Sequence, residues 1–202
     1  MSRSIFIVGI EGNMGRRYAA IAKYLGIDCS GCDIHSSRVE RMAPKDALVI
    51  IATPTPCHLA DCLKYLSTNE NDVLCEKPIV KSEQALKTLA ELNLDRLYMV
   101  NNYCFAETID RSGKITFYDY YNSGKDGLAW DCIQLIGLAK NEIELYNKRP
   151  FWTCIINGAE IDRNSIDRSY VKMIFNLMNE KINVWSGQKI IEVHQKVLNY
   201  IG

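Results

Sequence analysis

The chain has 202 residues, 48% of them hydrophobic, and its 24 basic residues balance its 24 acidic ones. This length allows one or two domains with a well-buried core, and the balanced charge gives no basic surface for nucleic acid and no charged patch for a membrane. The longest apolar runs are too short to span a bilayer and the N-terminus lacks a signal-peptide core, so we expect a cytoplasmic protein that acts on a small molecule.

The first half of the chain alternates apolar strands with helices. Strands are predicted at 5–9, 27–33, 48–53, 72–75 and 97–101, and helices at 14–25, 56–68 and 82–93. The strands are continuous apolar runs, which is typical of a parallel sheet covered on both faces. We therefore expect an α/β fold with a doubly wound parallel sheet in residues 1–108.

A glycine-rich turn, Gly9-Ile10-Glu11-Gly12-Asn13-Met14-Gly15, joins the first strand to the first helix. Two of its glycines would let the backbone approach a pyrophosphate, and Gly15 would let the helix pack closely on the strand. Free N–H groups at the helix start would bind the phosphates. The spacing is G-x-x-G-x-x-G, with Ile10 where the commonest fingerprint has its first glycine. An isolated match of this kind is often a plain turn, so the prediction depends on the strand, helix and acid around it. The predicted contacts at this turn are Gly9, Gly12, Asn13, Met14 and Gly15.

An acidic residue, Asp33, ends the second predicted strand. Its separation from the turn is near that of a carboxylate that binds the ribose hydroxyls of NAD. Arg38 and the pair Ser36-Ser37 could instead surround the 2′-phosphate of NADP. The sequence slightly favours NAD and leaves the choice between NAD and NADP open.

The eight cysteines include two close pairs, Cys29 with Cys32 and Cys57 with Cys62. The first pair lies in a predicted strand, where residues three apart point to opposite faces and cannot converge on a metal ion. The other cysteines are scattered among apolar neighbours. We therefore expect no metal site, and interpret the thiols as free, buried and reduced.

The run Glu76-Lys77-Pro78 follows the fourth predicted strand. As a bare tripeptide it is common, and Lys77 would then be an ordinary surface lysine. At the carboxyl end of a parallel strand, however, a side chain points into the crevice where open α/β sheets bind ligands. An ammonium group there can stabilise a developing alkoxide or pass a proton, and Glu76 could orient it.

The second half changes character in the polar segment 107–113. A strand is predicted at 114–122, a helix at 127–139, a hairpin at 151–161 that turns at Asn157-Gly158, and helices at 165–179 and 187–200 with Ser186 as N-cap of the last. We expect residues 109–202 to form a small α+β domain with a reduced open sheet.

These residues resemble the Gfo/Idh/MocA oxidoreductases, named for glucose–fructose oxidoreductase and inositol dehydrogenase. The resemblance is strongest over residues 5–105. It depends on the glycine turn, on Ala52-Thr53-Pro54-Thr55-Pro56 with His58, on Val73-Leu74-Cys75-Glu76-Lys77-Pro78 and on Val100-Asn101-Asn102-Tyr103. It implies a Rossmann-like first domain that binds NAD or NADP, with Lys77 beside the nicotinamide and the substrate. Thr53, Pro54, His58 and Glu76 would then lie near the cofactor, although His58 could equally cap a helix. His194 and His35 are interpreted as surface or packing residues.

The second domain resembles a shortened form of that family's substrate domain. Its segment Lys125-Asp126-Gly127-Leu128-Ala129-Trp130-Asp131 is similar to the one that supplies an aspartate to the family's site, which implies a site role for Asp131. Where the family often has a histidine one turn later, this chain has Leu135, beside Gln134. Neither side chain can exchange a proton. Either Lys77 or Tyr103 transfers the proton, or the substrate differs, or the protein binds a dinucleotide without turning it over.

The resemblance implies an NAD(P)-dependent oxidoreductase that transfers a hydride to or from a small hydroxyl or carbonyl substrate, such as a sugar derivative. The alternative is a non-catalytic dinucleotide-binding or scaffold protein, and a third interpretation is a hydrolase or lyase that uses NAD transiently. The family also pairs its subunits through the second-domain sheet. Here Phe117, Tyr121 and Trp152 would form an apolar face that favours a homodimer, unless the two C-terminal helices cover it.

Overall fold

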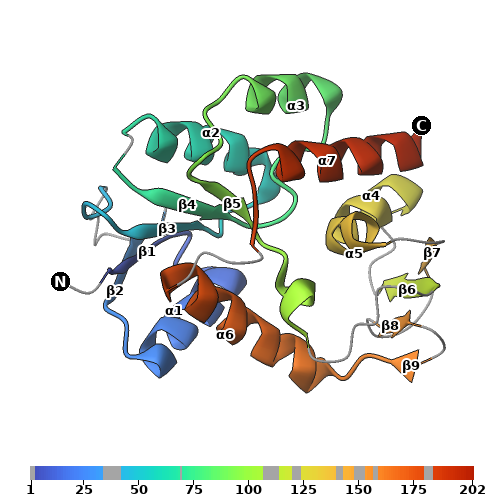
Figure 1. The fold of residues 1–202 in the computed structure, drawn as a ribbon, viewed down its shortest axis with the longest axis horizontal. Helices are drawn as coiled ribbons and strands as arrows, with labels where there is room; N and C mark the ends of the chain where they lie inside the picture. Colours follow the sequence, from blue (N-terminus) through green and yellow to red (C-terminus); the bar gives the residue numbers. More distant parts are fainter. Residues whose placement is uncertain are drawn as a thin grey trace.

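The computed structural model describes residues 3–33, 42–68, 70–106, 114–119, 124–139, 143–147, 153–156, 159–179 and 184–202. Two sheets and the helices around them make up this part of the chain (Figure 1). Among the described residues, no helix is both long and apolar enough to cross a membrane.

The larger sheet has six strands in the order β10-β5-β4-β3-β1-β2. Its strands are β1 (Ile5–Val8), β2 (Cys29–Cys32), β3 (Leu48–Ile51), β4 (Asp72–Cys75), β5 (Leu97–Met99) and β10 (Trp185–Ser186). The first five pair in parallel, while β10 lies antiparallel to β5. The five strands predicted in the first half and their parallel arrangement are confirmed, and the chain has the α/β fold expected.

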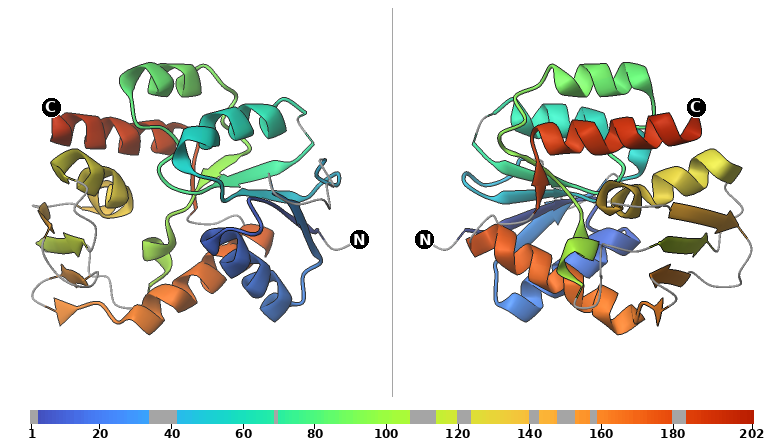
Figure 2. Two further views of the ribbon diagram at one scale, coloured as in Figure 1. Left: turned by 180° about the vertical axis from the view of Figure 1, so that it is seen from behind. Right: turned by 45° about the vertical axis from the view of Figure 1, so that its right-hand side comes forward.

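Helices cover both faces of this sheet. One face carries α1 (Asn13–Leu25) and α6 (Arg163–Asn179), and the other carries α2 (Thr55–Leu66), α3 (Glu83–Ala90) and α7 (Gln188–Ile201) (Figures 1 and 2). Successive strand residues point to opposite faces, so Ile5 and Ile7 pack under α1 while Phe6 and Val8 join the other cluster. Because both faces are covered, β1, β3, β4 and β5 are buried throughout.

The smaller sheet has the order β7-β6-β8-β9. Its strands are β6 (Ile115–Asp119), β7 (Ile143–Asn147), β8 (Thr153–Ile156) and β9 (Ala159–Glu160). β7 runs parallel to β6, whereas β8 is antiparallel to β6 and to β9. The strand β7 was not predicted. The antiparallel pair of β8 and β9 agrees with the hairpin predicted at 151–161, although its turn at 157–158 lies outside the described residues.

Two short helices connect β6 to β7, where one helix was predicted. They are α4 (Gly124–Asp131) and α5 (Ile133–Leu138), separated at Cys132, whose backbone has φ −94° and ψ 10°. The break turns α5 so that Leu135 points to the sheet. The single helix expected at 127–139 is therefore wrong in its continuity.

Side chains from α4 and α5 cover the inner face of the smaller sheet. Ile115, Phe117 and Cys154 pack against Leu128 and Leu135 in one buried cluster. Phe117 is only 3% exposed, so it does not belong to an open apolar face, and the cover comes mainly from α4 and α5 rather than from the two C-terminal helices. Tyr121 and Trp152 lie outside the described residues.

The last part of the chain returns to the larger sheet. Ser186 lies in β10, paired with Tyr98, so it is not the N-cap predicted for the following helix. Gly187 takes that position with φ 55°, which a glycine adopts without strain. The division into domains 1–108 and 109–202 stays a prediction, and residues beyond 108 supply β10, α6 and α7 to the first sheet.

Candidate functional site

The glycine turn is built for a close approach of backbone. Gly9 has φ +86°, and a Cβ there would lie 2.9 Å from the carbonyl oxygen of Ala52. A Cβ on Gly15 would overlap the carbonyl oxygen of Gly9, so the start of α1 can pack on the end of β1 only through a glycine. The turn is closed by the N–H of Gly12, which donates to the same Gly9 carbonyl at 3.1 Å.

The start of α1 is open to an anion. Glu11, Gly12 and Asn13 are exposed, the N-cap Gly12 provides no side-chain hydrogen bond, and no acidic residue lies in the first turn. Met14, next along the helix, is partly buried. Uncapped N–H groups and the helix dipole together favour a phosphate at this position. These features fit the pyrophosphate of a dinucleotide.

Asp33 follows β2 and lies at the same turn. Its Oδ2 accepts the backbone N–H of Glu11 at 3.2 Å. The carboxylate predicted for the ribose is thus held next to the glycine turn, as a dinucleotide site requires. Arg38 and Ser36-Ser37 lie outside the described residues.

Three residues after β3 form a compact group. Pro54 is the N-cap of α2, and the hydroxyl of Thr53 donates to Asp61 Oδ2 at 2.7 Å. His58 is 1% exposed, and its ring nitrogens lie 2.7 Å from the carbonyl oxygens of Thr53 and Pro78. His58 therefore holds the loops after β3 and β4 together, and its ring would have to break one of these contacts before a nitrogen could meet a cofactor.

Glu76 is buried and bonds away from the ammonium of Lys77. Its Oε1 accepts the hydroxyl of Tyr18 at 2.6 Å, and its Oε2 accepts the backbone N–H of Lys77 at 3.1 Å. Burial, followed by the charge of Glu76, raises the pKa of Tyr18 well above its usual value. The expectation that Glu76 orients the Lys77 ammonium is not met, because its carboxylate is used to join α1 to the loop after β4.

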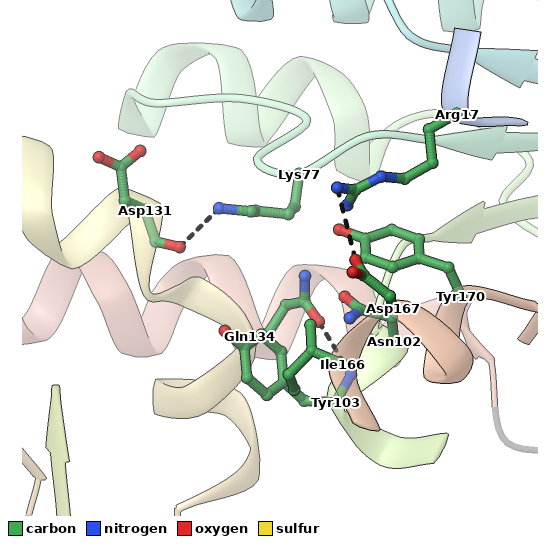
Figure 3. A pocket seen from close by; sticks show the side chains of 9 residues that line it. All are labelled: Arg17, Lys77, Asn102, Tyr103, Asp131, Gln134, Ile166, Asp167 and Tyr170. Atoms are coloured by element: carbon green, nitrogen blue, oxygen red, sulfur yellow. Dashed lines mark hydrogen bonds and ion pairs between the residues drawn. The ribbon is translucent and has the colours of Figure 1, made fainter. Parts of the chain in front are cut away.

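The side chain of Lys77 crosses from the first sheet toward the helices of the second half. Its Nζ donates to the backbone carbonyl oxygen of Asp131 at 2.6 Å, whereas the Asp131 carboxylate points away from it (Figure 3). The structure thus brings these two predicted site residues together, through the main chain of Asp131. The contact spans the crevice between the two sheets.

A cavity of about 470 Å³ lies beside this contact. Its walls come from α1, the loop after β4, the 3₁₀ turn η1 (Asn102–Phe105) and helices α4, α5 and α6. The lining residues are Arg17, Lys77, Asn102, Tyr103, Asp131, Gln134, Ile166, Asp167 and Tyr170 (Figure 3). All three residues predicted as catalytic, Lys77, Asp131 and Tyr103, line this one cavity.

Several lining residues were not predicted from the sequence. Arg17 comes from α1, where it pairs with Asp167 at 3.5 Å and lies 5.0 Å above the ring of Tyr170. The exposed pair contributes little to stability. Ile166, Asp167 and Tyr170 come from α6, whose sequence shows only an amphipathic helix, so no signal could have placed them here. Asn102 belongs to the motif Val100-Asn101-Asn102-Tyr103, from which the sequence predicts a role only for Tyr103.

Tyr103 lines the cavity as a phenol that is held in its protonated form. Burial raises its pKa well above the usual value of 10, with smaller contributions from Cys154 and Tyr170. A group that transfers protons at neutral pH works best with a pKa near 7. Tyr103 therefore remains a neutral phenol.

Leu135, at the position of the family histidine, and its neighbour Gln134 point in different directions. Leu135 is 1% exposed and packs in the cluster beneath the smaller sheet, while Gln134 lines the cavity. Adjacent helical residues are about 100° apart around the axis, which explains the difference. The amide of Gln134 therefore faces the cavity, and the side chain of Leu135 does not.

All eight cysteines are free thiols, and Cys29 and Cys32 lie on β2 as predicted. Four of the thiols are buried, whereas Cys29 and Cys57 are exposed, so the expectation of burial is wrong for these two. Within the described ranges, no group of three His, Cys, Asp or Glu side chains could hold a metal ion.

No protein-family model matches this sequence, and the comparison with curated proteins gave no match. Similarity is found among solved structures. The WlbA (WbpB) dehydrogenase of Thermus thermophilus, in complex with NAD and UDP-GlcNAcA, aligns with a TM-score of 0.64 and 11% identity over 99% of this chain and 95% of its own.

Two further structures align equally well. A myo-inositol dehydrogenase of Corynebacterium glutamicum has a TM-score of 0.67 with 11% identity over 98% of this chain and 95% of its own. A Gfo/Idh/MocA family oxidoreductase of Vibrio cholerae has a TM-score of 0.68 with 12% identity over 97% and 94%. The resemblance noted in the sequence is confirmed at the level of the fold: this chain has the Rossmann-like fold of the Gfo/Idh/MocA oxidoreductases.

Proposed function

We propose that this protein is an NAD(P)-dependent oxidoreductase that acts on a small hydroxyl or carbonyl compound, such as a sugar derivative. The observation that carries the proposal is the position of Lys77, at the carboxyl end of β4 and in the wall of a cavity. The open start of α1 and Asp33 lie at the same edge of the sheet, at the carboxyl ends of β1 and β2. A nicotinamide bound there would supply the hydride donor or acceptor.

The roles of the protein groups follow from their contacts. The Lys77 ammonium would polarise the reacting oxygen of the substrate, since a cation stabilises the developing alkoxide in a site shielded from water. The carbonyl oxygen of Asp131 positions that ammonium at 2.6 Å. Tyr103 would add a neutral hydrogen bond. We favour NAD as the cofactor because Asp33 lies at the glycine turn, and NADP is the alternative.

A second function, a non-catalytic dinucleotide-binding protein, is favoured by one observation. Among the described residues, none that lines the cavity is a histidine, and Leu135 is buried in the core beneath the smaller sheet. Proton transfer would then depend on Lys77, whose ammonium is held by a carbonyl oxygen that cannot take a proton. In this alternative the protein binds the cofactor and turns nothing over.

The first experiment is a fluorescence titration of the protein with NADH and with NADPH. Saturation at micromolar concentration by either would support the cofactor site, and the tighter ligand would decide the preference. Failure of both to bind would refute both functions.

A variant of Lys77 separates catalysis from binding. We expect Lys77→Ala to lose on the order of 10²- to 10⁴-fold in rate, because the reacting oxygen loses its cation, while NADH still binds. The rate is followed as reduced cofactor formed with a panel of polyols and sugars. Lys81→Ala, an exposed lysine of the same loop, is the matched control and should retain the wild-type rate. A Lys77→Ala enzyme as active as wild type would remove Lys77 from the mechanism, and turnover of any compound by the wild type would eliminate the non-catalytic alternative.

We also propose that the protein forms a homodimer through the outer face of the smaller sheet. With Phe117 buried inside, the described part of this face carries Thr116, Glu144, Tyr146 and Ile155, and Tyr146 is 45% exposed. Lys114 pairs with Glu144 at its edge. Light scattering at micromolar concentration should give twice the chain mass of 23.0 kDa, and a monomer mass would refute the dimer.

A further inference from the structure

Two polar atoms in the wall of the cavity are buried without a partner. Asn102 and Gln134 are each 1% exposed, and among the residues that the structure describes, Asn102 Oδ1 and Gln134 Nε2 have no hydrogen-bond partner. Their amide groups lie between Lys77 and Tyr103 (Figure 3). A buried polar atom without a partner is unfavourable, so two such atoms in one cavity mark the place of a bound group.

Neighbouring hydrogen bonds fix which end of each amide is left for that group. Asn102 Nδ2 donates to Ser169 Oγ at 3.0 Å, and the Ser169 hydroxyl donates in turn to the carbonyl oxygen of Ile166 at 2.5 Å. Gln134 Oε1 accepts the backbone N–H of Tyr103 at 3.4 Å. Turning the first amide over would oppose two acceptors, and turning the second would oppose two donors. The cavity therefore offers one fixed acceptor, on Asn102, and one fixed donor, on Gln134.

The strand order relates this pair to the proposed cofactor site. The start of α1 and Asp33 lie at the carboxyl ends of β1 and β2, whereas Lys77 follows β4 and Asn102 follows β5, on the other side of β1. A dinucleotide with its pyrophosphate at α1 and its adenine ribose at Asp33 has its nicotinamide on the β4 side. Arg17, in the second turn of α1, lines the cavity, so the cavity wall begins roughly 6 Å along the helix from Asn13. The nicotinamide end of the cofactor therefore extends toward both amides.

We propose that Asn102 and Gln134 recognise the carboxamide group of the nicotinamide. A primary carboxamide carries an NH₂ donor and a carbonyl acceptor, so its NH₂ pairs with Asn102 Oδ1 and its oxygen with Gln134 Nε2. Both buried atoms are then satisfied by one neutral group of the cofactor, and Lys77 stays available to the substrate. This inference rests on the proposed function, since it concerns the cofactor of the same site. It holds equally for an enzyme and for a non-catalytic binder, because it concerns affinity and not turnover.

Neutral cofactor analogues that change only this group provide the test. In the acetylpyridine analogue of NAD a methyl group replaces the NH₂, and in the thionicotinamide analogue a sulfur, which is a weak acceptor, replaces the oxygen. ADP-ribose lacks the nicotinamide altogether. Calorimetric titration of the full chain measures each affinity, with the 2′-phosphate forms if NADPH is the tighter cofactor. We expect the wild type to bind NAD on the order of tenfold more tightly than either analogue, because each analogue leaves one buried atom unpaired.

Two variants with side chains of similar size assign the two partners. Asn102→Leu should bind NAD about tenfold more weakly and no longer distinguish it from the acetylpyridine analogue, since the partner of the NH₂ is gone. Gln134→Met should in the same way lose the distinction between NAD and the thionicotinamide analogue. Gln84→Met, at an exposed position of α3, is the matched control and should keep the wild-type preferences. ADP-ribose should bind every variant with the wild-type affinity, which shows that each is folded.

The outcomes separate this inference from the proposed function. Loss of each preference in its own variant, at constant affinity for ADP-ribose, supports the assignment. If NAD binds but a folded variant keeps the wild-type preferences, or if the wild type binds NAD and both analogues equally, the assignment is overturned while the cofactor site stands. The wild-type comparison needs no variant, so it decides even where a substitution prevents folding. If neither NAD nor ADP-ribose binds, the proposed function and this inference are both refuted.

Discussion

His194 holds the loop that carries Lys77. Its Nε2 accepts the backbone N–H groups of Ile79 at 3.1 Å and Val80 at 3.4 Å, and its Nδ1 donates to the carbonyl oxygen of Ile190 at 2.7 Å. This pattern requires a neutral ring with the proton on Nδ1. Burial lowers the pKa of His194 from 6.5 to about 4, against a smaller opposite effect of the Ile190 carbonyl.

The lowered pKa makes the free energy of unfolding depend on pH. The unfolded chain takes up a proton near pH 6.5, whereas the folded chain resists until about pH 4, so the contribution is complete above pH 6.5 and is lost as the pH falls toward 4. The full loss is about 3 kcal/mol. Urea unfolding at a series of pH values measures it.

His194→Gln is the comparison for this prediction. The glutamine oxygen can accept an N–H of the loop and does not titrate, so the difference between wild type and variant should shrink between pH 6.5 and 4. A difference that stays constant across this interval would show that His194 does not titrate as described.

The glycine turn depends on the space around Gly15, and Gly26 at the far end of α1 provides a matched control. Gly15→Ala puts a Cβ into the Gly9 carbonyl, which should displace the turn, cost about 1–3 kcal/mol and weaken NADH binding. Gly26→Ala, at the other end of α1, meets no atom within 4 Å and should cost only the strain of its φ of +67°, about 1 kcal/mol, with NADH binding unchanged. Equal NADH affinity in the two variants would contradict the role of the turn.

The sequence best predicts the elements in which buried apolar residues follow one another along the chain. β1 and β3 are runs of apolar residues, and β4 has three such residues after Asp72, so the local pattern alone identifies these strands. β10 has two residues and exists only because Trp185 and Ser186 meet β5, a contact that no local pattern contains. β7 reads Ile-Glu-Leu-Tyr-Asn and is a strand because it pairs with β6.

The same distinction holds for the site. Gly15, Asp33 and Lys77 could be placed from the sequence because each lies at the end of a predicted parallel strand or at the turn that follows one. Asn102 and Gln134 line the same cavity only because α5 turns at Cys132 and η1 packs against α6. Long-range packing of this kind cannot be read from spacing.

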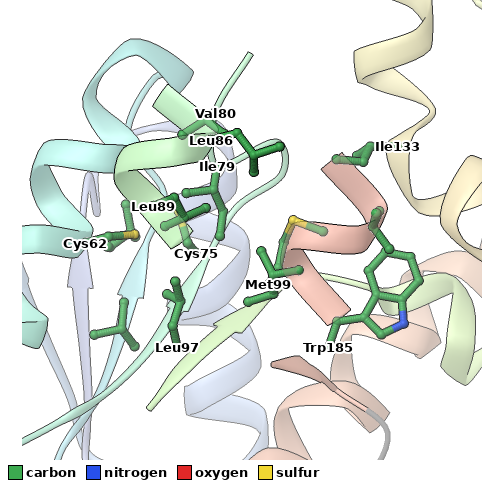
Figure 4. Close-up of a cluster of buried hydrophobic side chains, with 14 of the residues drawn as sticks. Cys62, Cys75, Ile79, Val80, Leu86, Leu89, Leu97, Met99, Ile133 and Trp185 are labelled. Carbon is green, nitrogen blue, oxygen red and sulfur yellow. The ribbon is translucent and has the colours of Figure 1, made fainter. Parts of the chain in front are cut away.

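A single apolar core joins the two halves of the molecule. Trp185 packs in one cluster with Leu86 and Leu89 of α3 and with Ile133 of α5 (Figure 4). Ile190 of α7 belongs to the same cluster. The buried face of α7 packs against both the layer on the first sheet and the helices of the second half. If either half unfolded alone, this apolar face of α7 would be exposed to water. The halves are coupled through α7.

This coupling predicts one unfolding transition for the whole chain. Far-UV circular dichroism should coincide in urea with the fluorescence of the buried tryptophans, which include Trp130 of α4 and Trp185 of β10. Ile190→Ala, at a fully buried position of α7, should lower the free energy of unfolding by about 2–5 kcal/mol in both signals. Lys196→Ala, on the exposed side of the same helix, is the control. Two separate transitions would contradict the shared core.

The pairing of β10 with β5 also affects how the chain is made. Met99 leaves the ribosome long before Trp185, its partner across the sheet. At roughly 5–20 residues per second, the growing chain carries β5 for several seconds as an outer strand that is paired with β4 on one edge and has no partner on the other. An exposed strand of this kind invites pairing with other unfinished chains. The nascent protein should therefore depend on chaperones most strongly in the interval after β5 has emerged and before β10 and α7 arrive to close the sheet.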